Sequence, residues 1–277
     1  MCAYSALPMP EARPPSARDR ARFADLARIA AEIAVAVGDA IAVEDTAIVT
    51  RKRGRANFAT AADHTAERTI LARLAAHDRG IPVLTEESPR RELVRADRVW
   101  VVDPIDGTLN FSRGLPFYCV VIGYVEDGRS RAGAVHAPRT RETFVAAEGS
   151  GATLNGASIH VSRVARLADA FAVTSLRFGE TRKPGSRFAA LNASCARLRV
   201  IGSAGLEMAY VAMGRLDLFV HEALFPWDVA APALVAREAG AAVLSLKSGG
   251  DAVWNERQVV IANPVLAREA IGLLRRT

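Results

Sequence analysis

Two carboxylates, Asp103 and Asp106, stand three residues apart in the segment 100–111, directly after an apolar run. The β-branched residues of that run predict a buried strand. Proline cannot donate to a strand ladder, so the chain is expected to turn at Pro104. Carboxylates held together in a dry place repel one another unless a cation lies between them. Hard oxygen ligands favour Mg²⁺ or Mn²⁺ over zinc, so the segment predicts a site for a divalent cation.

Three further acids follow other predicted elements. Glu86 and Glu87 come directly after a second strand-like segment, and Asp228 opens a helical pattern. Each of them alone is also typical of a solvated turn or a helix N-cap. Five acids at three turns, however, are the ligand set expected for a cluster of divalent ions. The amides of Gly107 and Thr108, which come next in the first segment, can hold a phosphate oxygen if a helix starts there.

With these motifs the chain resembles a known family, the inositol monophosphatases, within the wider group of Mg²⁺-dependent, lithium-sensitive sugar phosphatases. The resemblance covers residues 22–275. Its ordered motifs are residues 60–63, 86–88, 100–111, 202–204 and 227–240. It implies a fold of the α/β (α+β) class, a layered αβαβα sandwich of two intimate lobes with the metal site between them.

The resemblance also implies that two or three Mg²⁺ ions act as cofactors. The implied ligands are Glu86, Asp103, the carbonyl oxygen of Ile105, Asp106 and Asp228, with Asp103 bridging two ions. Two metals can hold both the attacking and the leaving oxygen of an in-line displacement. A metal-activated water would then attack the phosphate without a covalent intermediate.

Four residues receive catalytic roles from the same resemblance. Glu86 is both a metal ligand and a catalytic residue. Either Glu87, or Thr108 held by Asp63, would orient the attacking water and accept its proton. The amides of Gly107 and Thr108 would hold the phosphate group.

Substrate contacts are implied in the same way. They fall on Asp106, Gly107, Thr108, the turn of Gly202, Ser203 and Ala204, an acid shortly before Asp228, and Lys52. Counting back from Asp228, the position of the family's glutamate falls on His221, and Glu222 comes one residue later. Both residues are candidates, and this departure puts strict inositol specificity in question.

These residues predict a Mg²⁺-dependent phosphomonoesterase that hydrolyses a small phosphorylated polyol, with inositol-1-phosphate as the first candidate. Histidinol phosphate, fructose 1,6-bisphosphate and phosphoadenosine phosphate are alternatives within the family. A rival from another class is a protein that chiefly binds the transcription machinery, although the intact acid set argues against a dead enzyme. The resemblance further implies a homodimer.

Composition narrows the class of protein. The 277 residues are 50% hydrophobic and hold three scattered cysteines, which favours a reducing, cytoplasmic location. No apolar run approaches the roughly 18–20 residues that span a bilayer, so no membrane association is expected. The net charge of +6 would attract an anionic phosphomonoester. The basic run 51–55 resembles a nucleic-acid patch, but a solvated loop is preferred, and no nucleic-acid partner is expected.

The chain divides into three predicted parts. Residues 1–21, rich in Pro, Ala and Arg, predict a disordered tail. Residues 22–165 predict an N-terminal α+β lobe, with helices near 23–37 and 62–77 on a mostly antiparallel sheet. Residues 166–277 predict a C-terminal α/β lobe in which strands and helices alternate.

Overall fold

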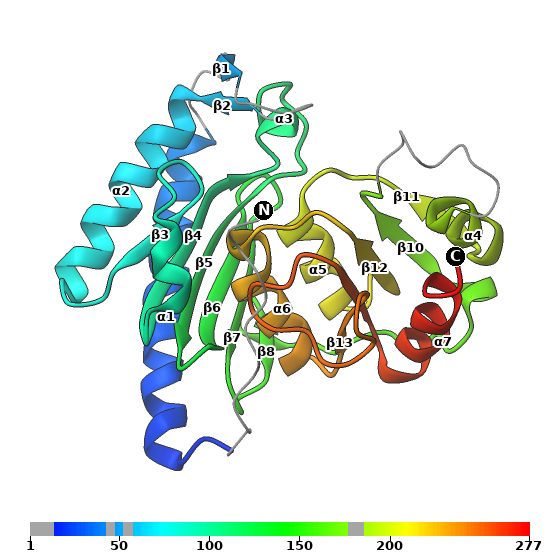
Figure 1. Cartoon of the computed structure of the whole chain (residues 1–277). Helices are drawn as coiled ribbons and strands as arrows, with labels where there is room; N and C mark the ends of the chain where they lie inside the picture. Colours follow the sequence, from blue (N-terminus) through cyan, green and yellow to red (C-terminus); the bar gives the residue numbers. More distant parts are fainter. Residues whose placement is uncertain (1–13, 43–47, 52–57, 177–185) are drawn as a thin grey trace.

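The structure, a computed structural model, describes residues 14–42, 48–51, 58–176 and 186–277. This described chain folds into five layers in the order helices, sheet, helices, sheet, helices (Figure 1). The layered αβαβα sandwich expected from the sequence is therefore confirmed.

In the described chain the larger sheet has seven strands in the order β3-β4-β5-β6-β7-β8-β9. They span Val83–Thr85, Arg98–Asp106, Cys119–Glu126, Arg129–Ala137, Glu142–Ala147, Ala152–Leu154 and Ala157–Ser158. β3 and β4 pair in parallel, and the remaining neighbours are antiparallel. Positive φ angles at Asp127 and Gly128 close the β5–β6 hairpin, as Glu126-Asp-Gly in the sequence predicts.

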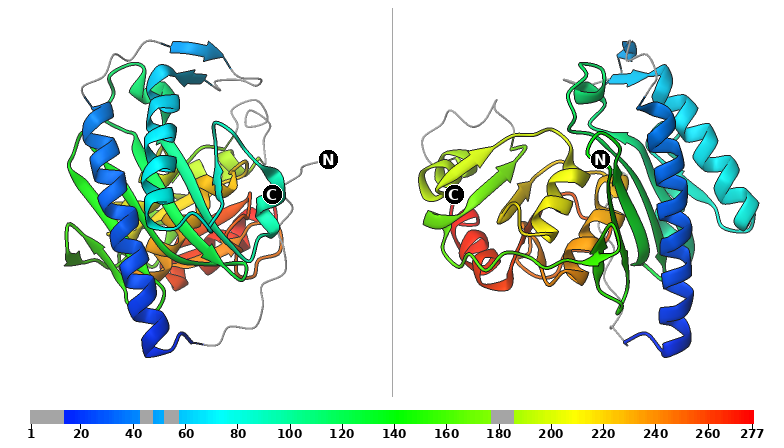
Figure 2. Two further views of the ribbon diagram at one scale, coloured as in Figure 1. Left: turned by 90° about the vertical axis from the view of Figure 1, so that its left-hand side faces the viewer. Right: turned by 180° about the vertical axis from the view of Figure 1, so that it is seen from behind.

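Two helices cover the outer face of this sheet, as both views in Figure 2 show. α1 (Ala17–Ile41) packs against β5, β6 and β7 with one buried stripe that includes Phe23, Ile33 and Val37. α2 (Ala61–His77) packs beside α1 and against β4. α2 begins directly after Thr60, which matters for the site because its first turn carries Asp63.

The middle layer consists of α5 (Ala204–Ala212) and α6 (Pro226–Glu238). α6 approaches β5 and β6 closely because Gly133 has no side chain: a Cβ atom there would lie 2.6 Å from the Cβ of Ala231. α6 also contacts β4, so the start of this helix lies beside the strand that carries Asp103 and Asp106.

In the described chain the second sheet has five strands in the order β11-β10-β12-β14-β13. They span Arg197–Arg199, Phe171–Thr174, Leu218–His221, Val259–Ala262 and Ala242–Ser245. β10 pairs in parallel with β11 and β12, whereas β14 is antiparallel to β12 and β13. α4 (Arg187–Ser194) and α7 (Pro264–Leu274) form the last layer.

Short elements complete the fold. β1 (Ile48–Arg51) and β2 (Phe58–Thr60) form an antiparallel pair, and α3 (Thr108–Phe111) follows β4 at once. The single 3-10 turns η1 and η2 span Arg91–Arg95 and Leu167–Asp169. Along the described ranges, no helix combines the length and apolar character needed to cross a membrane.

The start of α1 corrects one expectation. The helix begins at Ala17, inside the segment 1–21 that was predicted to be a disordered tail. Ser16 and Asp19 form a capping box, which satisfies helix N–H groups before the first buried residue is reached. Residues 1–13 of the predicted tail, and Lys52 as a predicted substrate contact, lie outside the described residues.

The course of β4 corrects the expectation that the chain turns at Pro104. The strand does not end at Pro104 but continues to Asp106. Pro104 lies within a register shift between Asp103 and Asp106, and a bulge does not require the N–H group that proline lacks.

Candidate active site

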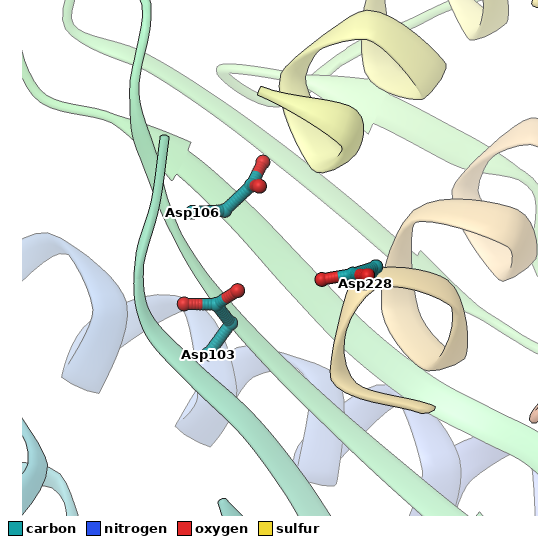
Figure 3. Close-up of side chains that lie close together, drawn as sticks. All are labelled: Asp103, Asp106 and Asp228. Carbon is teal, nitrogen blue, oxygen red and sulfur yellow. The ribbon is translucent and has the colours of Figure 1, made fainter. Parts of the chain in front are cut away.

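Three carboxylates converge beside the end of β4. Asp103 and Asp106 come from that strand, and Asp228 comes from the first turn of α6. One carboxylate oxygen of each lies within 4.8 Å of the other two. Figure 3 shows the three side chains facing a common space.

The bulge in β4 explains why two acids three residues apart share one face. In a regular strand, residues at that spacing point to opposite faces. Here Asp103 pairs with Val121 and Asp106 with Cys119, so three steps along β4 match two steps along β5. The extra residue restores the same orientation for both carboxylates. The N–H group of Ile105, within the bulge, donates to Asp103 Oδ1 at 3.1 Å.

Asp106 is held by the N-terminus of α5. Its Oδ2 accepts the Ser203 hydroxyl at 2.6 Å and the Gly205 amide at 2.7 Å, and its Oδ1 accepts the Ala204 amide at 3.2 Å. The Cys119 thiol lies 3.5 Å from Oδ2. An acid of the larger sheet thus caps a helix of the middle layer, which favours its negative charge.

Asp228 is oriented by its own helix. Pro226 opens α6, and the Phe225 amide donates to Asp228 Oδ2 at 2.7 Å. Proline suits a first helical position because no partner is needed for its missing N–H group. This local arrangement fixes one oxygen of Asp228.

The three acids destabilise one another's charged forms. Burial raises the pKa of Asp103 well above its ordinary value, and the charges of Glu86, Asp106 and Asp228 raise it further. Burial and the charge of Asp106 likewise raise the pKa of Asp228 well above the ordinary range. Burial also raises the pKa of Asp106, although its hydrogen bonds from Ser203 and Gly205 oppose that rise.

The donor set fits a divalent metal. Within the described ranges, none of these three aspartates makes an ion pair with lysine or arginine. Asp103 and Asp106 are buried and Asp228 is half-buried, and the charge of Arg257 opposes the rise in pKa only at Asp228. Repelling carboxylates without a paired cationic side chain are the oxygen ligands that a hard cation requires.

The two glutamates after β3 lie at the border of this cluster. The charge of Glu86 raises the pKa of both Asp103 and Asp228, so its carboxylate lies near these two aspartates. The side chain of Glu87 is only 1% exposed, and its Oε2 lies 4.0 Å from His64 Nδ1 of α2. Glu86 thus lies beside the aspartate cluster, whereas Glu87 lies beside His64 of α2.

Asp63 and Thr108 form a connected pair. Both the N–H and the hydroxyl group of Thr60 donate to Asp63 Oδ2, at 2.7 and 2.6 Å. The Thr108 hydroxyl lies 3.2 Å from Asp63 Oδ1 and 3.1 Å from the carbonyl oxygen of Ile105. Asp63 is fully buried and rigidly held, so it is suited to orient the threonine hydroxyl.

Gly107 turns the chain from β4 into α3. Its φ angle of 95° is left-handed, and a Cβ atom would lie 2.9 Å from the carbonyl oxygen of Phe117. Glycine alone fits that turn without strain. The first backbone donors within the following helix are Phe111 and Ser112, so the amides of Gly107 and Thr108 precede the helical bonds.

The residues expected to contact the substrate divide into two groups. In the turn before α5, Ser203 and Ala204 donate to Asp106, while Gly202 is exposed. At the end of β12, Glu222 forms an ion pair with Arg187 of α4. His221 stacks on Phe219 with ring centroids 5.9 Å apart, and its Nδ1 accepts the amide of Ala223 at 3.0 Å.

Glu207, a residue near the site, belongs to none of the sequence motifs. Glu207 of α5 is completely buried, and its Oε1 accepts the amides of Ile201 and Gly202 at 2.9 and 3.0 Å. The signal that could have pointed to it is a single acid within the apolar helix sequence AGLEMAYVA. Such an acid is costly to bury unless it binds a specific partner.

Comparison with known proteins agrees with this geometry. The sequence model of the inositol monophosphatase family matches residues 19–277. A protein of Thermotoga maritima named fructose-1,6-bisphosphatase/inositol-1-monophosphatase is 35% identical over 226 residues, which cover 82% of this chain and 86% of that protein. Nus factor SuhB of Escherichia coli K12 is 34% identical over 232 residues, 83% of this chain and 86% of the relative. The solved structure of a Thermotoga maritima IMPase superimposes with a TM-score of 0.83 at 32% identity, covering 91% of this chain and 97% of that one.

Proposed function

Since this chain belongs to the inositol monophosphatase family and is therefore a phosphoric monoester hydrolase, we propose that it is a Mg²⁺-dependent phosphatase of small polyol phosphates. Inositol-1-phosphate is the first candidate substrate. The observation that carries the proposal is the convergence of the buried Asp103 and Asp106 with the half-buried Asp228 in a mutually repelling cluster.

The ligands would be these three aspartates together with Glu86 and the carbonyl oxygen of Ile105. Carboxylate and carbonyl oxygens without nitrogen or sulfur ligands favour Mg²⁺ over zinc. Two or three ions would fit the number of acids. When bound, Mg²⁺ supplies charge stabilisation of the phosphoryl oxygens and a more acidic water at neutral pH.

Protein groups would then orient the reactants. The buried carboxylate of Asp63 would hold the Thr108 hydroxyl toward the attacking water, and Glu87 is the alternative acceptor of the water's proton. The amides of Gly107 and Thr108 would donate to the phosphate oxygens. Since these donors are fixed by a left-handed turn, little reorganisation is needed during the reaction.

The leaving alcohol would lie between the turn 202–204 and the end of β12. Glu222 is engaged by Arg187, which favours His221 as the residue that reads the alcohol. A ring whose Nδ1 accepts an amide carries its proton on Nε2 when neutral, so His221 would offer a donor where the family's glutamate offers an acceptor. This difference keeps fructose 1,6-bisphosphate, histidinol phosphate and phosphoadenosine phosphate as alternative substrates.

A screen of phosphomonoesters tests the proposal. Phosphate release would be measured with saturating Mg²⁺ from inositol-1-phosphate, the three alternatives and 4-nitrophenyl phosphate. We expect one polyol phosphate to exceed the aryl phosphate in kcat/KM. Equal, slow release from every compound would contradict a dedicated phosphatase. The same proposal includes inhibition by lithium, a cytoplasmic location and a homodimeric state. Inhibition kinetics test the first, cell fractionation the second and light scattering the third.

A second candidate function comes from the relatives' names. Several relatives, including the Escherichia coli protein, are named Nus factor SuhB, which suggests a role in transcription. Binding of the purified chain to RNA polymerase would support that role. An Asp103→Asn variant that keeps this binding while losing phosphatase activity would show that the two functions are separate.

A further inference from the structure

The turn before α5 is held from both sides by buried acids. On the side of the larger sheet, Asp106 accepts the Ser203 hydroxyl and the amides of Ala204 and Gly205. The side chain of Asn110 adds a bridge, because its Nδ2 donates to the carbonyl oxygen of Ile201 at 2.9 Å. These contacts tie the turn to β4 and α3.

Glu207 holds the opposite side of the same turn. Its Oε1 accepts the amides of Ile201 and Gly202 at 2.9 and 3.0 Å, and the side chain is fully buried. Its Oε2 has no hydrogen-bond partner among the described residues. The carboxyl group is therefore bound to the protein through the one oxygen that meets the turn.

Packing alone gives no reason for an acid at this position. The other residues of α5 that face the core are apolar or small, including Leu206, Met208 and Ala209. An apolar side chain would avoid the cost of burying a carboxyl group. What an apolar side chain would not provide is an acceptor for two backbone amides, which would be left unsatisfied.

We propose that Glu207 is a positioning residue that fixes the turn 201–204 against the leaving-group side of the active site. The inference rests on the proposed function, because that function places substrate contacts at Gly202 and Ser203. Glu207 itself touches neither substrate nor metal. It acts by setting the path of Ile201 and Gly202, so that the exposed edge of the turn meets the alcohol, while the contacts of Asp106 with Ser203, Ala204 and Gly205 stay in place.

The test compares Glu207→Ala with Glu207→Gln. The glutamine keeps an oxygen for the two amides, whereas the alanine removes it. Asp217→Ala is the matched control, since Asp217 is a buried acid that accepts a backbone amide, that of Phe171 at 2.7 Å, at the far end of β12. The probes are inositol-1-phosphate, as the polyol phosphate, and 4-nitrophenyl phosphate, which lacks the polyol.

In Glu207→Ala we expect KM for inositol-1-phosphate to rise about tenfold, with kcat and the KM for the aryl phosphate nearly unchanged. Glu207→Gln and Asp217→Ala should keep the ratio of the two KM values. A Glu207→Ala variant with an unchanged ratio, or with equal losses on both substrates, would overturn the positioning role.

Hydrogen exchange provides a readout that does not depend on activity. In Glu207→Ala the amides of Ile201 and Gly202 should exchange at least about tenfold faster, while both stay protected in Glu207→Gln and Asp217→Ala. Unchanged protection in Glu207→Ala would also overturn the inference. If the wild-type chain hydrolyses neither probe nor any of the three alternative substrates, the proposed function fails, and the exchange result still decides whether Glu207 holds the turn.

Discussion

Asp103 and Asp106 are close neighbours with different supports. Asp106 receives three hydrogen bonds from the start of α5, and these favour its charged form. Asp103 receives one from the amide of Ile105, and the charges of four acids around it oppose its charged form. Asp103 therefore has more to gain from a bound cation than Asp106, which agrees with the bridging position between two metals that the family resemblance implies for it.

Replacing Asp103 separates its catalytic role from its role in stability. Asp103→Asn keeps the size of the side chain but removes a charge that a hard cation needs. We expect kcat to fall by at least about 10²-fold at saturating Mg²⁺, since metal charge stabilisation is worth several kcal/mol. In chelator, the free energy of unfolding should equal or exceed that of the wild type, because repulsion among the acids is relieved. Phosphate release and urea denaturation measure the two quantities, and a near-normal kcat would contradict the assignment.

Glu207 should make stability depend on pH. Burial raises its pKa from 4.5 to about 7, so the folded protein keeps a proton that the unfolded chain loses between those values. The contribution of the protonated Glu207 to the free energy of unfolding is complete below about pH 4.5. It is lost as pH rises through about 7, and the total loss is roughly 3 kcal/mol. Glu207→Gln cannot lose a proton, so its free energy of unfolding should gain on that of the wild type from pH 5 to 8. Urea denaturation in saturating Mg²⁺ measures the free energy of unfolding of both proteins at each pH. If the two values change in parallel with pH, the raised pKa of Glu207 would be refuted.

Sequence alone could locate residues whose roles are local. The acids of the segment 100–111 and Asp228 are recognisable because each follows an apolar run or opens a helix. The support of Asp106 by Ser203 was not predictable, because it joins residues far apart in the chain. The ion pair of Glu222 with Arg187 is non-local in the same way, so the sequence could not show that Glu222 has this partner.

At the scale of elements, β4 and α6 build the site together. The bulge in β4 turns Asp103 and Asp106 to one side, and α6 brings Asp228 to meet them. The two outer helices follow from hydrophobic periodicity: they were expected near 23–37 and 62–77, and they span Ala17–Ile41 and Ala61–His77. The bulge at Pro104 was not expected, because a proline in a strand-like segment is as typical of a chain turn as of a bulge.

The close contact of α6 with the sheet can be tested at Gly133. In Gly133→Ala the new Cβ would lie 2.6 Å from that of Ala231, so α6 must move away from β6. We expect the free energy of unfolding to fall by about 1–3 kcal/mol, as in other overpacked cores, and the affinity for Mg²⁺ to fall because Asp228 moves with the helix. Gly250→Ala is the control, because its Cβ would come no closer than 3.8 Å to the Oγ of Ser248. Equal Mg²⁺ affinity in both variants, measured by calorimetry, would show that α6 tolerates the shift.

At the scale of the whole molecule, the site joins layers that are distant in sequence. The larger sheet provides Asp103 and Asp106, the outer helix α2 provides Asp63, and the middle layer provides Asp228 and the cap on Asp106. The layered architecture was predictable from the resemblance and the alternation of elements. The meeting of these acids at one site depends on long-range packing, which no local sequence pattern encodes.

The dependence of turnover on Mg²⁺ tests the central claim most directly. After metal removal by excess chelator, phosphate release from inositol-1-phosphate would be measured as Mg²⁺ is added back, with Asp228→Asn in parallel. We expect no turnover in chelator, full recovery with Mg²⁺, and a loss of at least about 10²-fold in the folded variant even at saturating Mg²⁺. Undiminished turnover in excess chelator, or a near-normal rate in Asp228→Asn, would contradict a reaction carried by metals at the aspartate cluster.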